Sequence, residues 1–279
     1  MSRLRLKTAF WRCILFLVLT LAGMGTAAVI LVVFQVFFIL PAVGMHPIVS
    51  VPAGMVQTYL TTEDGVRLNM WHSRLDAETA RPAQAVLIFH GNKDTVVSSL
   101  PLQRRFIEQG YASFAIDYRG TGQSSGWPTE DGLYRDAEAA WRFITEKEHY
   151  AARQIVLVGY SFGSGLATYL AKLYRPKAVV LIAPYTSLAD VVGDRWLLRY
   201  LKPFVRIHLP SKDFVKELIE VPIIAVHGTR DKVIAYHHTL DLEQECRPGC
   251  RFSKLIVEGA DHANIFDLSW PAVKQQLEG

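Results

Sequence analysis

Short apolar segments and longer amphipathic segments alternate along most of the chain. The apolar segments have the length and hydrophobic content of β-strands, and several are too uniformly apolar to keep one face in water. They lie at 56–60, 66–71, 85–89, 112–116, 154–159, 178–183, 222–226 and 254–257. Between the later ones lie helix-length segments with a period of about 3.6 residues, at 96–109, 131–147, 162–174, 236–246 and 263–277.

This alternation predicts an α/β fold with a mostly parallel, doubly wound sheet that helices cover on both faces. We expect the strands at 56–60 and 66–71 to form an antiparallel hairpin at the sheet edge. The 279 residues, half of them apolar, are enough for one catalytic domain of this kind plus an extension. In such sheets, the reactive groups lie in loops just beyond the carboxyl ends of the strands.

An uncharged apolar segment at residues 13–40 precedes the predicted sheet. It is longer than the ~20 residues that a helix needs to cross the hydrocarbon core, so the sequence predicts a transmembrane anchor. The alternative is a signal peptide cleaved near residues 25–27. That alternative fits less well, because the apolar run continues from Val29 to Leu40.

The distribution of positive charge predicts the orientation of this anchor. Lys and Arg side chains resist translocation, and none lies between residues 41 and 66. Four precede the anchor: Arg3, Arg5, Lys7 and Arg12. We therefore expect a cytoplasmic basic tail at 1–12, the anchor at 13–40, a linker at 41–54 and a catalytic domain at 55–279 outside the cytoplasm. No Asn-x-Ser/Thr site occurs, which favours a bacterial cell envelope.

Charge and cysteine content give little support to nucleic-acid binding or to a metal site. The net charge of +4 is modest and partly concentrated in the first twelve residues, so nucleic-acid binding has little support. Three cysteines without zinc-site spacing give no reason to expect a metal, and no cofactor is expected. Cys246 and Cys250 flank an Arg-Pro-Gly turn, and they form either a small disulfide loop or two free thiols.

Ser161 is the predicted nucleophile. The strand at 154–159 runs directly into Gly159-Tyr160-Ser161-Phe162-Gly163, and an apolar helix follows. This is the strand-turn-helix context of a nucleophile elbow, in which glycines allow a tight turn that exposes the serine Oγ. A Gly-x-Ser-x-Gly motif alone is weak, because these residues are common in loops. Its position between a buried strand and a helix makes the prediction specific.

A serine hydroxyl needs a general base at neutral pH, and that base needs an orienting acid. Asp231 lies just beyond the strand that ends at Val226, and His262 lies just beyond the last strand. The order Ser, Asp, His along the chain is that of α/β-hydrolases. We therefore predict a triad of Ser161, Asp231 and His262.

The oxyanion of the reaction needs two backbone N–H donors. One comes from the residue after the nucleophile, which is Phe162. The other comes from the loop after the first central parallel strand, where His90-Gly91-Asn92 follows the strand at 85–89. Asn92 is the predicted second donor, and Lys93 is the alternative.

Other His and Asp side chains are expected to have supporting roles. His90 and His227 precede glycines at strand ends, where histidines usually satisfy backbone groups of loops. Asp190 lies at a position that some hydrolases use for the acid, but Asp231 has the better context. Asp117 is expected to stabilise its own loop. The pair His237-His238 opens a helix and is expected to be solvated.

Together these motifs resemble the membrane-associated α/β-hydrolase-domain serine hydrolases, the group that contains lysophosphatidylserine lipases, monoacylglycerol lipases and protein depalmitoylases. The resemblance covers residues 56–275. It rests on His-Gly-Asn at 90–92, Asp-Tyr-Arg-Gly-x-Gly-x-Ser at 117–124, Pro-Thr-Glu-Asp-Gly-Leu-Tyr-x-Asp-Ala at 128–137, the elbow, Ala-Pro-Tyr-Thr-Ser at 183–187 and His-Gly-x-x-Asp at 227–231. It implies the α/β-hydrolase fold, cleavage of esters or thioesters of lipid-like acyl groups, and the same triad.

One departure from this group concerns the oxyanion loop. The group usually continues His-Gly-Asn with small residues, whereas Lys93 and Asp94 follow here. The departure leaves the details of that loop and the head-group preference open.

Residues 186–220 form a connection longer than usual, where this fold commonly inserts a cap over the substrate. Within it, residues 195–206 mix large apolar side chains with basic ones. The apolar set is Trp196, Leu197, Leu198, Tyr200, Leu201, Phe204 and Val205, and the basic set is Arg195, Arg199, Lys202 and Arg206. This mixture predicts either an interfacial helix that faces an anionic membrane, or a cap with a solvated basic face.

The predicted function is that of a membrane-anchored serine hydrolase that cleaves esters or thioesters of lipid-like acyl groups, such as lysophospholipids or monoacylglycerols. A serine aminopeptidase shares the fold and the motifs and is the alternative, although the sequence shows no acidic cluster committed to a free amine. A non-catalytic anchored receptor is a third hypothesis, and the complete triad argues against it.

Overall fold

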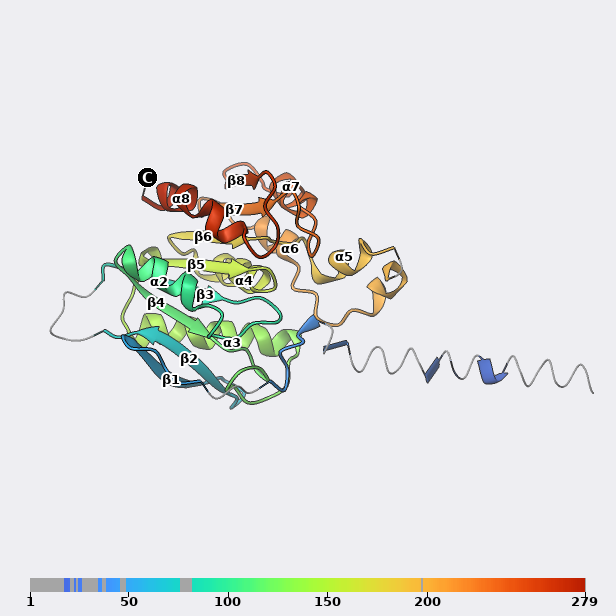
Figure 1. The fold of residues 1–279 in the computed structure, drawn as a ribbon, viewed down its shortest axis with the longest axis horizontal. Helices are drawn as coiled ribbons and strands as arrows, with labels where there is room; N and C mark the ends of the chain where they lie inside the picture. The colour runs from blue at the N-terminus through green and yellow to red at the C-terminus, as the bar shows by residue number, and fades with distance from the viewer. Residues whose placement is uncertain are drawn as a thin grey trace, which may run out of the picture.

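All eight predicted strands are present in the computed structural model, and they form one sheet (Figure 1). The structure describes residues 18–20, 23, 25–26, 35–36, 39–45, 49–75, 82–196 and 198–278. The strands are β1 Met55–Thr61, β2 Arg67–Ser73, β3 Gln84–Phe89, β4 Tyr111–Ile116, β5 Ile155–Tyr160, β6 Ala178–Ile182, β7 Pro222–Gly228 and β8 Arg251–Val257.

The strand order across the sheet is β1-β2-β4-β3-β5-β6-β7-β8. Strand β2 runs antiparallel to both of its neighbours, so β1 and β2 form the predicted edge hairpin. Every other pair of neighbours is parallel. The prediction of an α/β fold with a mostly parallel sheet is therefore confirmed.

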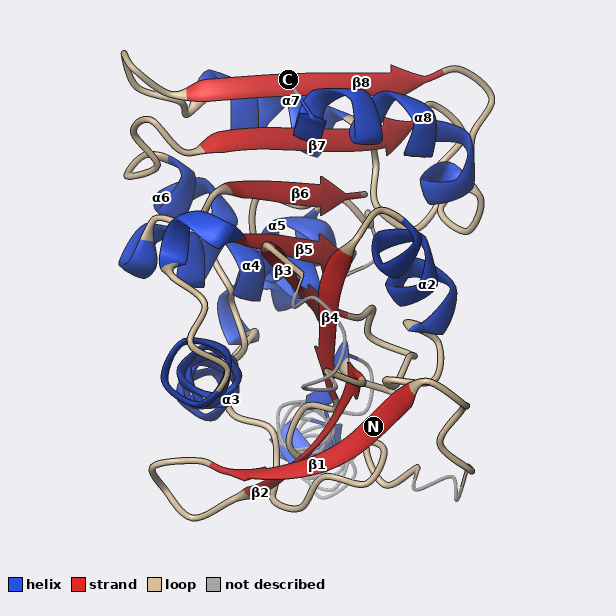
Figure 2. Ribbon diagram, turned by 90° about the vertical axis from the view of Figure 1, so that its left-hand side faces the viewer, coloured by secondary structure: helices blue, strands red, loops and turns tan. Residues whose placement is uncertain are grey.

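Helices cover both faces of the sheet, with α2 and α8 on one side and α3 and α4 on the other (Figure 2). Their bounds are α2 Leu100–Glu108, α3 Glu130–Arg142, α4 Gly163–Tyr174, α5 Leu188–Gly193, α6 Ser211–Val215, α7 His237–Gln244 and α8 Ile265–Glu278. Thr129 starts α3, because its hydroxyl accepts the N–H of Gly132 at 3.1 Å. A π-helical turn, Phe143–Lys147, continues α3.

Two hydrophobic clusters fill the spaces between the sheet and these helices. Along β3, Leu87 belongs to the cluster under α3 and α4, whereas Val86 and Ile88 belong to the cluster under α2 and α8. All three side chains are fully buried. Successive strand residues point to opposite faces, so a strand covered on both sides needs apolar residues at every position. This explains the uniformly apolar strand segments.

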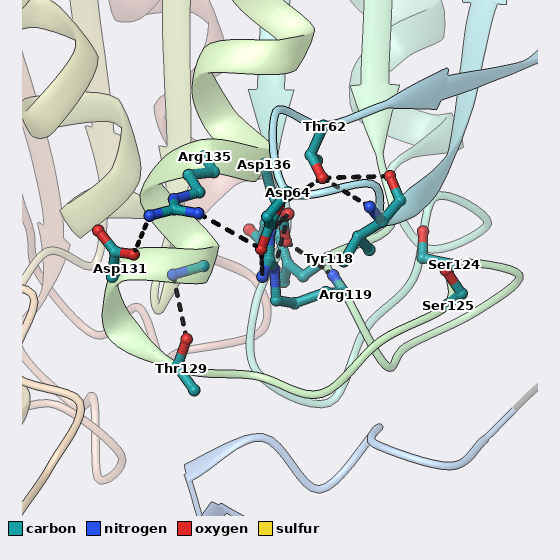
Figure 3. A network of polar contacts seen from close by, with 12 residues as sticks. Thr62, Asp64, Tyr118, Arg119, Ser124, Ser125, Thr129, Asp131, Arg135 and Asp136 are labelled. Atoms are coloured by element: carbon teal, nitrogen blue, oxygen red, sulfur yellow. Dashed lines mark hydrogen bonds and ion pairs between the residues drawn. The ribbon is translucent and has the colours of Figure 1, made fainter.

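A buried arginine joins three elements at the hairpin side of the molecule (Figure 3). Arg119 follows β4, and its guanidinium contacts Asp64 in the β1–β2 turn at 2.8 Å and Asp136 of α3 at 2.8 Å. The backbone N–H of Arg119 also donates to Asp136, at 2.8 Å. Asp136 is fully buried, and Arg119 is 4% exposed. The 117–137 motif block is therefore a structural joint between the hairpin, the sheet and α3.

Among the described residues, no helix combines the length and the apolar character that crossing a bilayer requires. The predicted tail at 1–12 and most of the predicted anchor at 13–40 lie outside the described residues.

The described end of the anchor segment packs onto the catalytic domain. Val36, Leu40 and Val43 are buried in the hydrophobic cluster that also lies under α3 and α4. The backbone N–H of Gly44 donates to the carbonyl of Gly120 at 2.9 Å. The folded domain therefore begins before residue 41 and includes the first part of the predicted linker.

The cap region at 186–220 contains α5, a 3₁₀-helix at Arg199–Phe204 and α6. Among the described residues of the predicted interfacial helix at 195–206, the regular part is one 3₁₀ segment, so the helix is shorter than expected. Pro203 lies inside this segment, and its missing backbone N–H disfavours an α-helix at that point.

Cys246 and Cys250 lie between α7 and β8. The structure joins them as a disulfide, with their Cα atoms 5.6 Å apart. The N–H of Cys250 donates to the carbonyl of Arg247 at 2.9 Å, which closes the turn between them. Of the two alternatives for these cysteines, the structure contains the disulfide loop.

Candidate active site

Ser161 occupies a sharp turn between β5 and α4. Its backbone φ is +50°, a left-handed conformation that is unfavourable for a residue with a side chain. Two glycines make the turn possible. A Cβ at Gly163 would lie 2.2 Å from the carbonyl oxygen of Phe89, and one at Gly159 would lie 2.5 Å from the Cα of Ser164. The predicted nucleophile elbow is present, and close packing of the backbone requires both of its glycines.

The structure brings the three predicted triad residues into one hydrogen-bonded chain. His262 Nε2 lies 3.0 Å from Ser161 Oγ, and His262 Nδ1 lies 2.6 Å from Asp231 Oδ2. Asp231 accepts the Nδ1–H, so the Nε2 lone pair faces the serine hydroxyl and can take its proton. The side chain of Asp231 is fully buried, whereas that of His262 is 18% exposed. A substrate can therefore reach the serine–histidine side of the chain.

The loop after β7 holds Asp231 from several directions. Its Oδ1 accepts the backbone N–H groups of Val233 at 2.8 Å and Ile234 at 2.9 Å. Burial acts to raise the pKa of this carboxyl, but hydrogen bonds from His227 and His262 outweigh burial and hold the pKa below its usual range. Asp231 is therefore a carboxylate at neutral pH, as the orientation of His262 requires.

His227 supports this loop, although sequence reasoning assigned it only a backbone-binding role. It is fully buried, and its Nε2 donates to the carbonyl of Ile234 at 2.9 Å. Its Nδ1 accepts the hydroxyl of Thr239 in α7 at 2.7 Å. The same Nε2 lies 3.4 Å from Asp231 Oδ2. His227 therefore binds a loop carbonyl, as predicted, and also sets the position of the acid.

Three tyrosines each hold one of the loops at His90, Phe162 and His262 through a hydrogen bond. The sequence does not single them out. Tyr118 OH donates to the carbonyl of His90 at 2.7 Å, Tyr185 OH donates to the carbonyl of Phe162 at 2.9 Å, and Tyr160 OH donates to the carbonyl of His262. Each tyrosine belongs to a quoted motif, but the motif does not indicate which group its hydroxyl binds. The partner carbonyls lie far away in sequence, and only the fold identifies them.

Both predicted oxyanion donors lie at the carboxyl ends of adjacent strands. Asn92 follows β3 and Phe162 follows β5, and these strands pair in parallel up to Phe89 and Gly159. Neither backbone N–H donates to any group within the described part of the chain. The two groups are thus available to a ligand, as an oxyanion hole requires.

The rival residues have other partners. His90 is buried, its Nδ1 donates to the carbonyl of Gly91 at 2.7 Å, and burial lowers its pKa. Asp117 accepts the backbone N–H groups of Val96 at 2.8 Å and Gln123 at 3.0 Å. Both side chains therefore bind backbone groups of the surrounding loops and stabilise those loops.

Asp190 lies in the cap and contacts Lys202 at 2.7 Å and Lys212 at 2.9 Å. Burial acts to raise its pKa, but these lysines and Ser187 outweigh burial and lower it. The carboxylate of Asp190 therefore connects α5 to the 3₁₀-helix and to α6 through these lysines, and it does not orient His262.

One cluster outside the triad has the donor types that metals prefer. Asp194, His237 and His238 bring one ligand atom each within 4.8 Å of the others. His238 is buried, contrary to the expectation of a solvated pair, and its Nδ1 contacts the hydroxyl of Thr186 at 2.9 Å. Asp194 lies within contact distance of both histidines, at 3.2 and 3.1 Å, and burial lowers the pKa of His238.

Known proteins resemble this chain in sequence. The family model described as serine aminopeptidase, S33 matches residues 80–216. An uncharacterised protein of Mycobacterium tuberculosis is 30% identical over 196 residues, which cover 70% of this chain and 68% of that protein. Human alpha/beta hydrolase domain-containing protein 17B is 36% identical over 154 residues, 54% of this chain, and the match spans only 50% of the human protein.

Solved structures resemble it in fold. An esterase of Pyrococcus furiosus superposes with a TM-score of 0.67 at 18% identity, over 83% of this chain and 96% of the esterase. Est1E of Butyrivibrio proteoclasticus, solved with ferulic acid, superposes with a TM-score of 0.65 at 17% identity, over 79% and 97% of the two chains. At such identities the likeness concerns the fold alone. Taken with the sequence matches and the elbow geometry, it leads to one assignment: this chain belongs to the α/β-hydrolase-domain family of serine hydrolases.

Proposed function

We propose that the protein is a carboxylic ester hydrolase that works through an acyl-enzyme on Ser161. The observation that carries the proposal is the continuous chain from Ser161 Oγ through His262 to the buried Asp231, with distances of 3.0 and 2.6 Å. A serine at a left-handed φ, facing an oriented histidine, is the arrangement that nucleophilic acyl transfer needs.

The proposed reaction follows from this geometry. Ser161 Oγ attacks the carbonyl carbon of the ester while His262 Nε2 takes the hydroxyl proton. The N–H groups of Phe162 and Asn92 stabilise the oxyanion. His262 then gives its proton to the leaving alcohol or thiol, and the acyl group stays on Ser161. Water, deprotonated by His262, attacks the acyl-enzyme and releases the carboxylic acid.

We propose lipid-like acyl esters or thioesters as substrates, with lysophospholipids and monoacylglycerols as the first candidates. Motif resemblance to lipid-directed hydrolases supports this class, as does the apolar segment that would hold the enzyme at a membrane. On the same proposal, the part of the predicted anchor that precedes Gln35 holds the chain in the membrane, residues 1–12 lie in the cytoplasm, and the catalytic domain lies outside it, in a bacterial cell envelope.

A serine aminopeptidase is the second candidate, because the matching family model carries that description. The same triad would then attack an amide, and specificity would require a carboxylate beside the site for the substrate's free amine. Asp190 is the acidic side chain that begins the cap, and two lysines already neutralise it. Asp190 is therefore not the carboxylate that would bind this amine.

The full chain in detergent, assayed against a substrate panel, tests the proposal. We expect hydrolysis of lysophospholipids or acyl glycerols, labelling by a fluorophosphonate, and loss of both in Ser161→Ala. Cleavage of aminoacyl nitroanilides without ester cleavage would select the peptidase. Absence of fluorophosphonate labelling in the wild type would show that the triad is not functional and would favour a receptor.

Double substitution separates a coupled triad from independent residues. Ser161→Ala and His262→Ala disable the same proton-coupled attack, so each alone should lower kcat by several orders of magnitude. The double variant should be scarcely slower than either single one. Losses that multiply in the double variant are incompatible with the assigned roles.

A further inference from the structure

We propose that residues 195–196, 198–206 and 233–236 form one docking surface, which lies on an anionic lipid bilayer beside the point where the apolar amino-terminal segment joins the domain. The proposal rests on the proposed membrane location. It adds which face of the enzyme meets the lipid and which side chains make the contact.

Large side chains on this docking surface are unusually exposed. Trp196 is 74% exposed, Tyr200 70% and Phe204 55%, although all three carry aromatic rings that normally bury much of their area. Val233 and Tyr236 are also more than two-fifths exposed. Clusters of this kind mark an interaction site, and Trp and Tyr are enriched where a protein meets the head-group layer of a bilayer.

The charge of the docking surface selects the lipid. Residues 195–206 contain three arginines and one lysine and no acidic residue. Lys202 pairs with Asp190, whereas Arg195, Arg199 and Arg206 are exposed and form no ion pair with any described residue. Three unpaired guanidinium groups beside exposed aromatic rings complement the anionic phosphates and the interfacial layer of a membrane.

The amino-terminal segment reaches the domain at the same place. Gln35 Nε2 donates to the carbonyl of Phe204 at 3.2 Å, and Gln35 Oε1 accepts the backbone N–H of Arg206 at 2.7 Å. Residues 13–34 precede this contact and suffice for the ~20 residues that cross a bilayer core. A chain that crosses the membrane there holds the docking surface against the lipid.

The docking surface also adjoins the catalytic acid loop. Arg195 donates to the carbonyl of Val233 at 3.4 Å, and the N–H of Val233 donates to Asp231 Oδ1 at 2.8 Å. The lipid-facing segment is therefore two hydrogen bonds away from the triad.

Tryptophan quenching in nanodiscs tests the proposal on the full chain. The discs contain phosphatidylcholine brominated in its acyl chains, with or without phosphatidylglycerol. We expect strong quenching in anionic discs, and we expect Trp196→Phe to remove a distinct part of it. Each cation near an anionic surface changes the ratio of lipid-bound to lipid-free docking surface about fivefold. Together, Arg195→Gln, Arg199→Gln and Arg206→Gln should therefore lower this ratio about a hundredfold.

A charge-matched control separates this surface from general attraction. Arg104→Gln, Arg153→Gln and Arg251→Gln remove the same charge from exposed arginines elsewhere on the domain, and they should leave quenching of Trp196 unchanged. Thermal midpoints establish that both triple variants fold. Trp196 quenching that is equal in neutral and anionic discs, or that falls equally in both triple variants, overturns the proposal.

Two further outcomes are distinguishable. In detergent without lipid, the protection of Trp196 from acrylamide quenching could increase with protein concentration. That result would assign the surface to a second copy of the chain and overturn the lipid proposal. Turnover of a soluble nitrophenyl ester by the wild type in the same discs reports the hydrolase separately. Quenching without turnover contradicts the proposed function, whereas turnover without quenching of Trp196 contradicts the docking surface.

Discussion

At the scale of single residues, the position of His262 depends on groups outside the triad. His227 fixes the loop carbonyl of Ile234 and lies 3.4 Å from the carboxyl of Asp231. Replacing it with Phe keeps the ring volume but removes both hydrogen bonds, and Asp231 then loses one of the donors that lower its pKa. We expect kcat to fall roughly tenfold to a hundredfold with KM little changed, because misplacing a catalytic group by about 1 Å costs on this scale.

The variant His227→Gln is the matched control for this prediction. Its amide has a donor and an acceptor, so it can serve both Ile234 and Thr239, and it should retain more of kcat than His227→Phe. Steady-state kinetics on a soluble ester measures both. Equal losses in the two variants, or a loss that appears only in KM, would mean that His227 has no role in positioning the acid.

At the residue level, sequence locates the groups that the structure brings together wherever chemistry dictates a motif. The elbow glycines, Ser161, Asp231 and His262 could be named because each lies at a strand end that the apolar pattern locates. The supporting residues could not. His227 and Tyr160 carry no local signature of their roles, because their partners lie on other elements and are identified only once the sheet order is known.

At the scale of elements, Asp190 is the joint of the cap. It contacts Lys202 of the 3₁₀-helix and Lys212 of α6, and Thr186 and Ser187 donate to it at 3.0 and 2.7 Å. Its pKa is lowered in the folded state, so its carboxylate stabilises the cap at any pH above its unfolded pKa of ~3.9. That contribution is lost as the pH falls through the lower, folded value.

Hydrogen exchange of residues 199–215 checks this pH dependence. We expect protection to be constant from neutral pH down to about 4 and to fall below it. Asp190→Asn should show the unprotected cap already at neutral pH. The control Asp213→Asn removes the same charge from an exposed acid of α6 that pairs, within the described part of the chain, only with Lys216, and it should leave the cap protected. Loss of protection in both variants would point to net charge instead of this joint.

The long elements were predictable and the cap was not. Strands and helices that pack on the sheet repeat their apolar positions often enough to show a period, and α3 and α8 were found in this way. The segments α5 and α6 have six and five residues, too few for a period to appear. Composition alone indicates one helix over 195–206, whereas the regular part of its described residues is the 3₁₀ segment at 199–204.

At the scale of the whole molecule, Arg119 holds the hairpin edge to the rest of the sheet. Burial raises the pKa of Asp136 to about 6 even with this guanidinium beside it, so the ionised form of Asp136 depends on Arg119. Arg119→Met leaves a buried carboxyl without its partner. We expect a loss of about 3–5 kcal/mol in the free energy of unfolding, measured by urea titration of tryptophan fluorescence.

The neighbouring Arg135 provides a control for this loss. It is 38% exposed and contacts Asp131 at 2.9 Å, so Arg135→Met should change the same free energy by about 1 kcal/mol or less. Comparable losses in the two variants would contradict the view that burial gives Arg119 its structural importance.

The contact of Gln35 with residues 204–206 leaves no free length of chain between the apolar segment and the domain. On the proposed membrane placement, no flexible linker lets the domain move away from the bilayer, so the enzyme encounters its substrate by diffusion in the plane of the membrane. Turnover would then follow the number of substrate molecules per unit of membrane area. Diluting a lipid substrate with inert lipid would slow the enzyme even at a constant bulk concentration, and the lateral mobility of the lipids would set the upper limit of the rate.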